Sequence, residues 1–120
     1  SYTAPTGADE GFEGQHNATR KGDELWVFDN TGNGSVSRAV RFDLTSAGEA
    51  LHSEHWYFDA RCPIQGGAVP VNGGVLATCV GSNDIRMFED GNATETWSLD
   101  ATCGSPNPVS LNRAIPVHIR

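Results

Sequence analysis

The chain has 120 residues, of which 38% are hydrophobic and 19% are charged, as expected for one globular domain and not for a disordered segment. Its formal net charge is −7 and its only lysine is Lys21, so it has no basic stripe with which to bind nucleic acid. No apolar run reaches membrane-spanning length. Because the start of the sequence is polar, we expect either a cytosolic protein or one whose leader has been removed.

Short segments rich in branched and aromatic residues, bounded by Gly, Asn and Asp, predict β-strands along most of the chain. A first strand is expected around His16, and the others cover residues 24–29, 38–44, 54–59, 67–71, 74–80, 85–89 and 94–100. Hairpin turns are expected at Asn72–Gly73, at 81–83 and at 90–92. One helical turn is conceivable within residues 45–54, although Gly48 weakens it. The fold class predicted is therefore all-β.

An internal repeat organises these strands. The segment HWYFDARC recurs as TWSLDATC, which places Trp56 and Trp97 41 residues apart. Each repeat is expected to hold four short antiparallel strands, in blade-like units at about residues 12–62 and 63–103, with a C-terminal strand at about 111–119. Four-stranded units of this period are typical of β-propeller blades. Since two blades cannot close a ring, additional blades are expected, from the same gene product or from copies of this chain.

Three cysteines allow one disulfide. Cys62 leads into one strand of a predicted hairpin and Cys79 ends the other, so this pair is the first choice, and Cys79 with Cys103 is the second. Three buried thiols remain the alternative. A disulfide would indicate an oxidising compartment, hence a periplasmic or secreted protein.

Several motifs resemble the C-terminal part of the bacterial aryl-sulfate sulfotransferases. They are GQH, LWVFDNTGNG, SRAVRFDL, a W-x-F outer strand and NRAIPV, and together they run from Gly14 to about Val117. The resemblance implies a six-bladed propeller that moves a sulfuryl group from a phenolic sulfate ester to another phenol. It also implies that the reaction needs no cofactor and that it passes through a covalent sulfo-histidine intermediate in the central channel. Other pocket residues of the family would lie upstream of Ser1, so the chain alone is expected to be inactive.

The resemblance places His16 on the motif of the family's histidine and Arg38 on that of an arginine. An imidazole group suits sulfuryl transfer, because its unperturbed pKa of about 6.5 leaves it neutral at working pH and a good leaving group later. The alternative is a polar histidine at the start of a strand. Arg38 could hold sulfate oxygens, or it could form an ion pair with Asp43 or Glu54.

The second repeat has glycine, Gly66, where the first has His16, which indicates that a blade does not need an imidazole at this place. Thr78 and Ser82, at the end of a middle strand, are candidate substrate contacts.

Other candidates have a structural interpretation. Residues 29–35 resemble a calcium loop faintly, but Val40 stands where a glutamate is needed, so a hairpin loop is expected and no metal site. His52 and His55 could bind a metal but are expected to be exposed loop residues. The remaining equivalent pairs of the two repeats are expected to be structural, namely Arg41 with Arg86 and Trp56 with Trp97.

Two further functions fit a partial propeller. One is a non-catalytic, oligomeric binding module, for example for sugars, and the other is a propeller that has lost its chemistry.

Overall fold

The computed structural model describes residues 2–3, 14–30, 36–58, 62, 65–80, 82–100 and 114–115. Within these ranges the chain forms strands and turns and no helix, so the predicted all-β class is confirmed. The first group of strands is β1 (Tyr2–Thr3), β2 (His16–Lys21), β3 (Glu24–Asp29), β4 (Arg38–Leu44) and β5 (Ala50–Tyr57). The second group is β6 (Gly67–Val71), β7 (Gly74–Cys79), β8 (Asp84–Glu89) and β9 (Glu95–Asp100).

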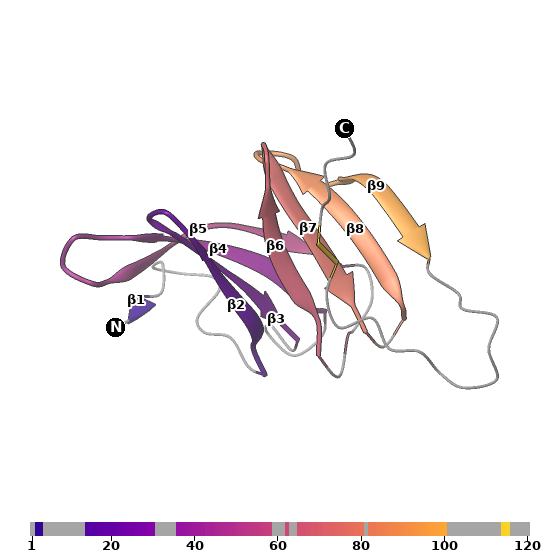
Figure 1. Ribbon diagram of the computed structural model, residues 1–120, viewed down its shortest axis with the longest axis horizontal. Helices are drawn as coiled ribbons and strands as arrows, with labels where there is room; N and C mark the ends of the chain where they lie inside the picture. The colour runs from indigo at the N-terminus through magenta and orange to yellow at the C-terminus, as the bar shows by residue number, and fades with distance from the viewer. Residues whose placement is uncertain are drawn as a thin grey trace.

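The strands form two sheets in which, apart from β1, neighbours in sequence are neighbours in space (Figure 1). The first sheet has the order β1-β5-β4-β3-β2, in which β2 to β5 are antiparallel and the two residues of β1 pair in parallel with β5. The second sheet has the order β6-β7-β8-β9 and is antiparallel throughout. The two predicted four-stranded antiparallel units are thus present, whereas their place in a propeller stays a prediction.

The local sequence explains most strand ends. The hairpin between β6 and β7 turns at Asn72–Gly73, where Gly73 adopts a φ of 77° that glycine tolerates readily. The helical turn conceived within residues 45–54 is wrong. Gly48 has a φ of 79°, and the backbone N–H of Thr45 donates to Glu49 O, so this segment reverses the chain and β5 begins at Ala50. Of the C-terminal strand predicted over 111–119, only Ala114 and Ile115 are described, and neither is part of a strand.

Aromatic side chains fill the space between the sheets. The first sheet and its C-terminal extension contribute Trp26, Phe28, Trp56 and Phe58, each at most 2% exposed, and the second contributes small residues together with Val75 and Phe88. The Trp26 and Trp56 rings stack with their centroids 5.6 Å apart. Burying each large side chain stabilises the fold by roughly 1.5–3 kcal/mol, so the interface holds the sheets in one arrangement.

Two arginines support this interface, in agreement with the structural role expected for them. Arg41 lies 5.4 Å above the Trp26 ring and pairs with Asp90, in the turn after β8 of the second sheet, 3.1 Å away. Arg86 lies 5.0 Å above the Phe58 ring and pairs with Glu95 of β9 at 2.8 Å, as well as with Asp84 of its own strand at 2.7 Å. Each guanidinium therefore covers an aromatic ring and links neighbouring elements.

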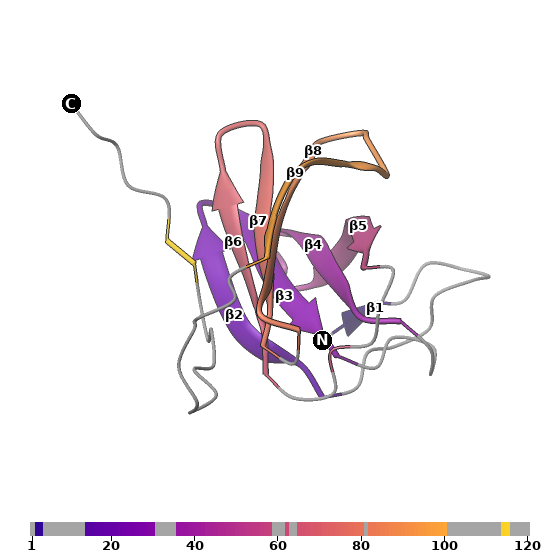
Figure 2. The same ribbon diagram turned by 90° about the vertical axis from the view of Figure 1, so that its right-hand side faces the viewer.

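One edge strand of the first sheet meets one edge strand of the second. β2 and β6 lie side by side, as both ribbon views show (Figure 2). The amide of Asn17 in β2 donates to Gly66 O, which precedes β6, at 2.5 Å. His16 opens β2 at this junction, so the fold places it where the two sheets are joined.

Candidate functional site

His16 is held through one of its ring nitrogens. Its side chain is half-buried, and Nδ1 lies 2.7 Å from Asn30 Oδ1 and 2.7 Å from Gly14 O. The ladder between β2 and β3 is irregular from His16 to Thr19, and Asn17 has a φ of 50°. This irregularity turns the start of β2 toward the residue that follows β3.

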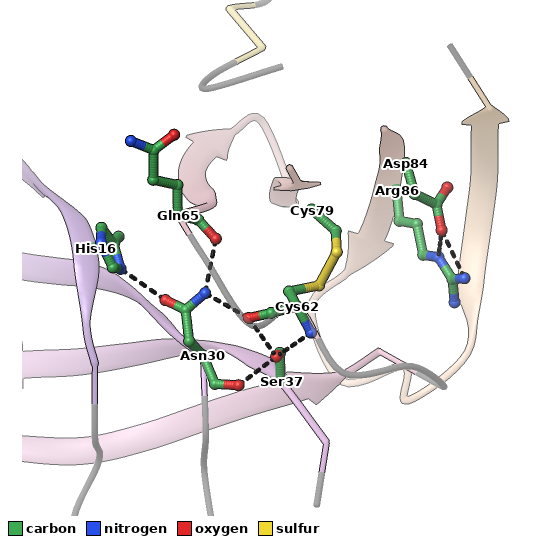
Figure 3. Close-up of a disulfide and its surroundings, with 8 residues drawn as sticks. All are labelled: His16, Asn30, Ser37, Cys62, Gln65, Cys79, Asp84 and Arg86. Carbon is green, nitrogen blue, oxygen red and sulfur yellow. Dashed lines mark hydrogen bonds and ion pairs between the residues drawn. A yellow bond between two sulfur atoms is a disulfide. The ribbon is translucent and has the colours of Figure 1, made fainter. Parts of the chain in front are cut away.

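Asn30 contacts Nδ1 of His16 through a side chain whose own orientation is fixed by other bonds (Figure 3). It follows β3 directly and is 1% exposed, and its Nδ2 donates to Cys62 O at 2.6 Å and to Gln65 O at 2.7 Å. Since both of these partners are carbonyl oxygens, the amide nitrogen must face them, and Oδ1 therefore faces His16 as an acceptor. A neutral His16 then carries its proton on Nδ1 and its lone pair on Nε2.

A second set of bonds fixes the peptide that Asn30 contacts. The backbone N–H of Cys62 donates to Ser37 Oγ at 2.8 Å, and that hydroxyl donates to Asn30 O at 2.5 Å. Cys62 and Cys79 form a disulfide with an S–S distance of 2.02 Å, and this is the pair that the sequence ranked first. Cys103, the second choice as a partner of Cys79, lies outside the described residues. His16 is thus connected through Asn30 to a covalent link between the sheet junction and β7.

Arg38 occupies a buried ion pair. Its Nε donates to Asp29 Oδ2 at 3.0 Å, and the two side chains are 2% and 0% exposed. The partner is neither Asp43 nor Glu54, the two that the sequence suggested. Asp29 and Arg38 pair across β3 and β4, while the alternate residue Phe28 faces the second sheet, so Arg38 points to the opposite face. The pair closes the base of the loop from which Asn30 and Ser37 extend.

The two candidate substrate contacts differ in accessibility. Thr78 is 1% exposed in β7, and its hydroxyl has no hydrogen-bond partner among the described residues. Ser82 is exposed in the turn between β7 and β8. Both lie at the same end of the second sheet as Cys79, but no bond in the described part of the chain connects either of them to His16.

His52 and His55 are not loop residues. They lie half-buried in β5, with His52 Nε2 and His55 Nδ1 3.0 Å apart. Residues three apart in a regular strand face opposite sides, but a shift in the pairing with β4, between Arg41 and Phe42, brings both imidazoles to one face. Among the described residues, no group of three or more His, Cys, Asp or Glu side chains could hold a metal ion.

Gly66 changes the comparison of the two repeats. It has a φ of 146°, and a Cβ placed on it would lie 2.3 Å from Cδ1 of Phe28, which is fully buried. The second repeat therefore has no room for any side chain where the first has His16. Glycine at this place has a steric cause, and it no longer supports a special role for the histidine.

No family model, no curated protein and no solved structure matches this chain. The described part of the chain contains no helix that is long and apolar enough to cross a bilayer. The disulfide is consistent with an extracellular or periplasmic protein.

Proposed function

We propose that the chain is part of an aryl-sulfate sulfotransferase-like protein, periplasmic or secreted, in which His16 carries a sulfuryl group between two phenols. The observation that supports this role is the pair of oxygen acceptors at Nδ1 of His16. Two acceptors, Asn30 Oδ1 and Gly14 O, face Nδ1, so the lone pair needed for attack is on Nε2. An accepting side chain behind a histidine is how many enzymes orient a reactive imidazole.

The reaction would proceed in two displacements. Nε2 of His16 attacks the sulfur of an aryl sulfate, the sulfur–oxygen bond breaks, and the phenolate leaves. The ring becomes positively charged when it carries the sulfuryl group, and the carbonyl oxygens at Nδ1 stabilise that charge through its N–H. The oxygen of a second phenol then attacks the sulfur, the sulfur–nitrogen bond breaks, and the phenol proton passes to solvent.

Arg38 serves the site through Asn30 in this proposal. Its side chain is 2% exposed and is bonded through Nε to the fully buried Asp29, so a sulfate could reach it only if this buried pair opened toward solvent. Breaking a buried ion pair is costly, so the pair instead fixes the ends of β3 and β4 on either side of Asn30 and Ser37. The sulfate would then be held by groups of the additional blades.

Mass spectrometry tests the proposed role of His16. The test uses the complete propeller protein of which this chain would be a part, here called the parent protein. After incubation with a phenyl sulfate and digestion under mildly basic conditions, it should carry one sulfuryl group on the peptide that contains His16. The His16→Gln variant should lose this adduct, and the matched variant His52→Gln should keep it. A parent protein without an adduct on His16 would refute the mechanism.

A second candidate, an oligomeric binding module, is favoured by one face of the second sheet. Trp56 and Trp97 occupy equivalent places in the two repeats, but Trp56 is 1% exposed against the second sheet, whereas Trp97 is 49% exposed. Leu99 is two residues further along a regular stretch of β9, hence on the same face as Trp97, and is 46% exposed. In the first repeat, the face that carries Trp56 is covered by the second sheet. In the second repeat, the equivalent face, around Trp97, is exposed, as expected if a further sheet packs against it.

The mass of the protein in solution separates the two candidates. A stable oligomer of the 12.8 kDa chain that dissociates in the Trp97→Ser/Leu99→Ser variant, together with no sulfuryl transfer, would favour the binding module. A chain that stays monomeric would favour the interpretation that it is one part of a longer propeller protein.

A further inference from the structure

We propose that the Cys62–Cys79 disulfide is a positioning element for His16, so that its loss changes which ring nitrogen carries the lone pair. The link consists of two hydrogen bonds and one covalent bond, from His16 to Asn30, from Asn30 to Cys62 O and from Cys62 to Cys79 (Figure 3). The inference rests on the proposed function for its biological meaning, because it concerns what keeps Nε2 available for attack.

Cys62 depends on this link because no strand holds it. It belongs to no strand, and its peptide is fixed by the bond of its N–H to Ser37 and the bond of its C=O to Asn30. Cys79, in contrast, ends β7, which pairs with β6 on one side and with β8 on the other. The disulfide therefore connects the acceptor carbonyl to one of the best-supported strands of the second sheet.

Burial makes the arrangement sensitive. Ser37, Cys62 and Cys79 are 0% exposed and Asn30 is 1% exposed, so water cannot readily replace a lost partner. If Cys62 O moves away, Nδ2 of Asn30 loses one of its two acceptors, and the opposite orientation of the amide becomes accessible. That orientation presents an N–H to Nδ1 of His16 and so favours the tautomer with the proton on Nε2, whereas Gly14 O and Gln65 O continue to favour the original arrangement, so the ratio of tautomers shifts without reversing completely. In the Nε2–H tautomer the lone pair is on Nδ1, which faces Asn30, and Nε2 has no lone pair with which to attack.

The redox step balances with a dithiol as reductant. Two electrons enter the sulfur–sulfur bond, each sulfur takes up one proton, and the reductant closes to its own disulfide. The two thiols must then separate to van der Waals distance, which displaces Cys62 because Cys79 is held in the ladder. Since both sulfurs are fully buried, reduction needs local opening and will be slow in the folded protein.

Nitrogen NMR of the imidazole tests the inference without any sulfuryl transfer. In ¹⁵N-labelled protein at a pH where His16 is neutral, we expect the Nδ1–H tautomer in the oxidised chain. The Cys62→Ala/Cys79→Ala variant should shift the ratio of tautomers by on the order of tenfold toward Nε2–H, about the value of one hydrogen bond. Val75→Ala, which removes core packing from the same strand without touching the link, is the matched control and should leave the ratio unchanged.

Two outcomes overturn the inference. One is a folded double-alanine variant whose His16 keeps its proton on Nδ1. If that variant does not fold, Ser37→Ala tests the same link, because it frees the N–H of Cys62 while the disulfide stays, and an unchanged tautomer ratio there also refutes the inference. The failure of the proposed function gives a different result. If the tautomer ratio shifts as expected but the parent protein forms no sulfuryl adduct, the sulfotransferase function is refuted and the positioning role of the disulfide is not.

Discussion

The substitution Gly66→Ala tests how closely the two sheets approach each other. An alanine Cβ would lie 2.3 Å from Cδ1 and 2.4 Å from Cε1 of the Phe28 ring, which is 0% exposed and surrounded by core residues. Overpacking a core in this way costs about 1–3 kcal/mol. The φ of 146°, which L-residues rarely adopt, adds about 1–3 kcal/mol. We therefore expect a loss of roughly 2–6 kcal/mol of unfolding free energy, a large part of the stability of a small domain.

Urea unfolding followed by tryptophan fluorescence measures this loss, which corresponds to a midpoint lower by roughly 1–3 M at a typical slope. Gly73→Ala is the matched control, because Gly73 also has a positive φ, 77°, but a Cβ there would meet nothing within 4 Å. Both substitutions restrict the unfolded chain equally, so this contribution cancels in the comparison. If Gly66→Ala lowers the midpoint no more than Gly73→Ala does, the close approach to Phe28 is refuted.

Further predictions compare equivalent residues in different surroundings, with the same unfolding measurement. Trp56→Ala should cost about 3–5 kcal/mol and Trp97→Ala less than about 1 kcal/mol, because the second side chain is 49% exposed; equal losses would show that another surface covers Trp97. Arg38→Met should cost about 3–5 kcal/mol, because it removes a cation paired with the buried Asp29. Arg20→Met, in a side chain that is 68% exposed, should stay within about 0.5 kcal/mol, and a similar loss in both arginine variants would contradict the burial of the Arg38 pair.

Local sequence was sufficient to predict most of the strands. β3, β4 and β6 begin and end at the residues predicted for them, because their alternating or continuous apolar residues give way to the polar turn residues Asn30, Thr45 and Asn72. β5 begins four residues before the predicted start at 54, since pairing with β4 draws in a polar segment that has little strand preference of its own. The parallel pairing of Tyr2 and Thr3 with β5 was not predicted, because two residues carry no pattern.

The site was predicted only in part, because its contacts are distant in sequence. His16 was singled out through the resemblance, whereas Asn30 and Ser37 were overlooked, although both lie within the quoted motifs. A small polar residue directly after a strand usually reads as a turn, and nothing local shows that Asn30 reaches Cys62, 32 positions away. The burial of Arg38 was also missed, because a sequence does not show which strand face a neighbouring segment covers.

The order of the strands has a consequence for folding. In both antiparallel units every strand pairs with the strand that precedes or follows it, so each ladder forms from contacts between residues close in sequence. Local contacts close small loops and favour rapid folding. We therefore expect each unit to assemble its ladder early, with the docking of the aromatic interface as the later step. Substitutions such as Trp56→Ala would then mainly speed unfolding and leave the folding rate nearly unchanged.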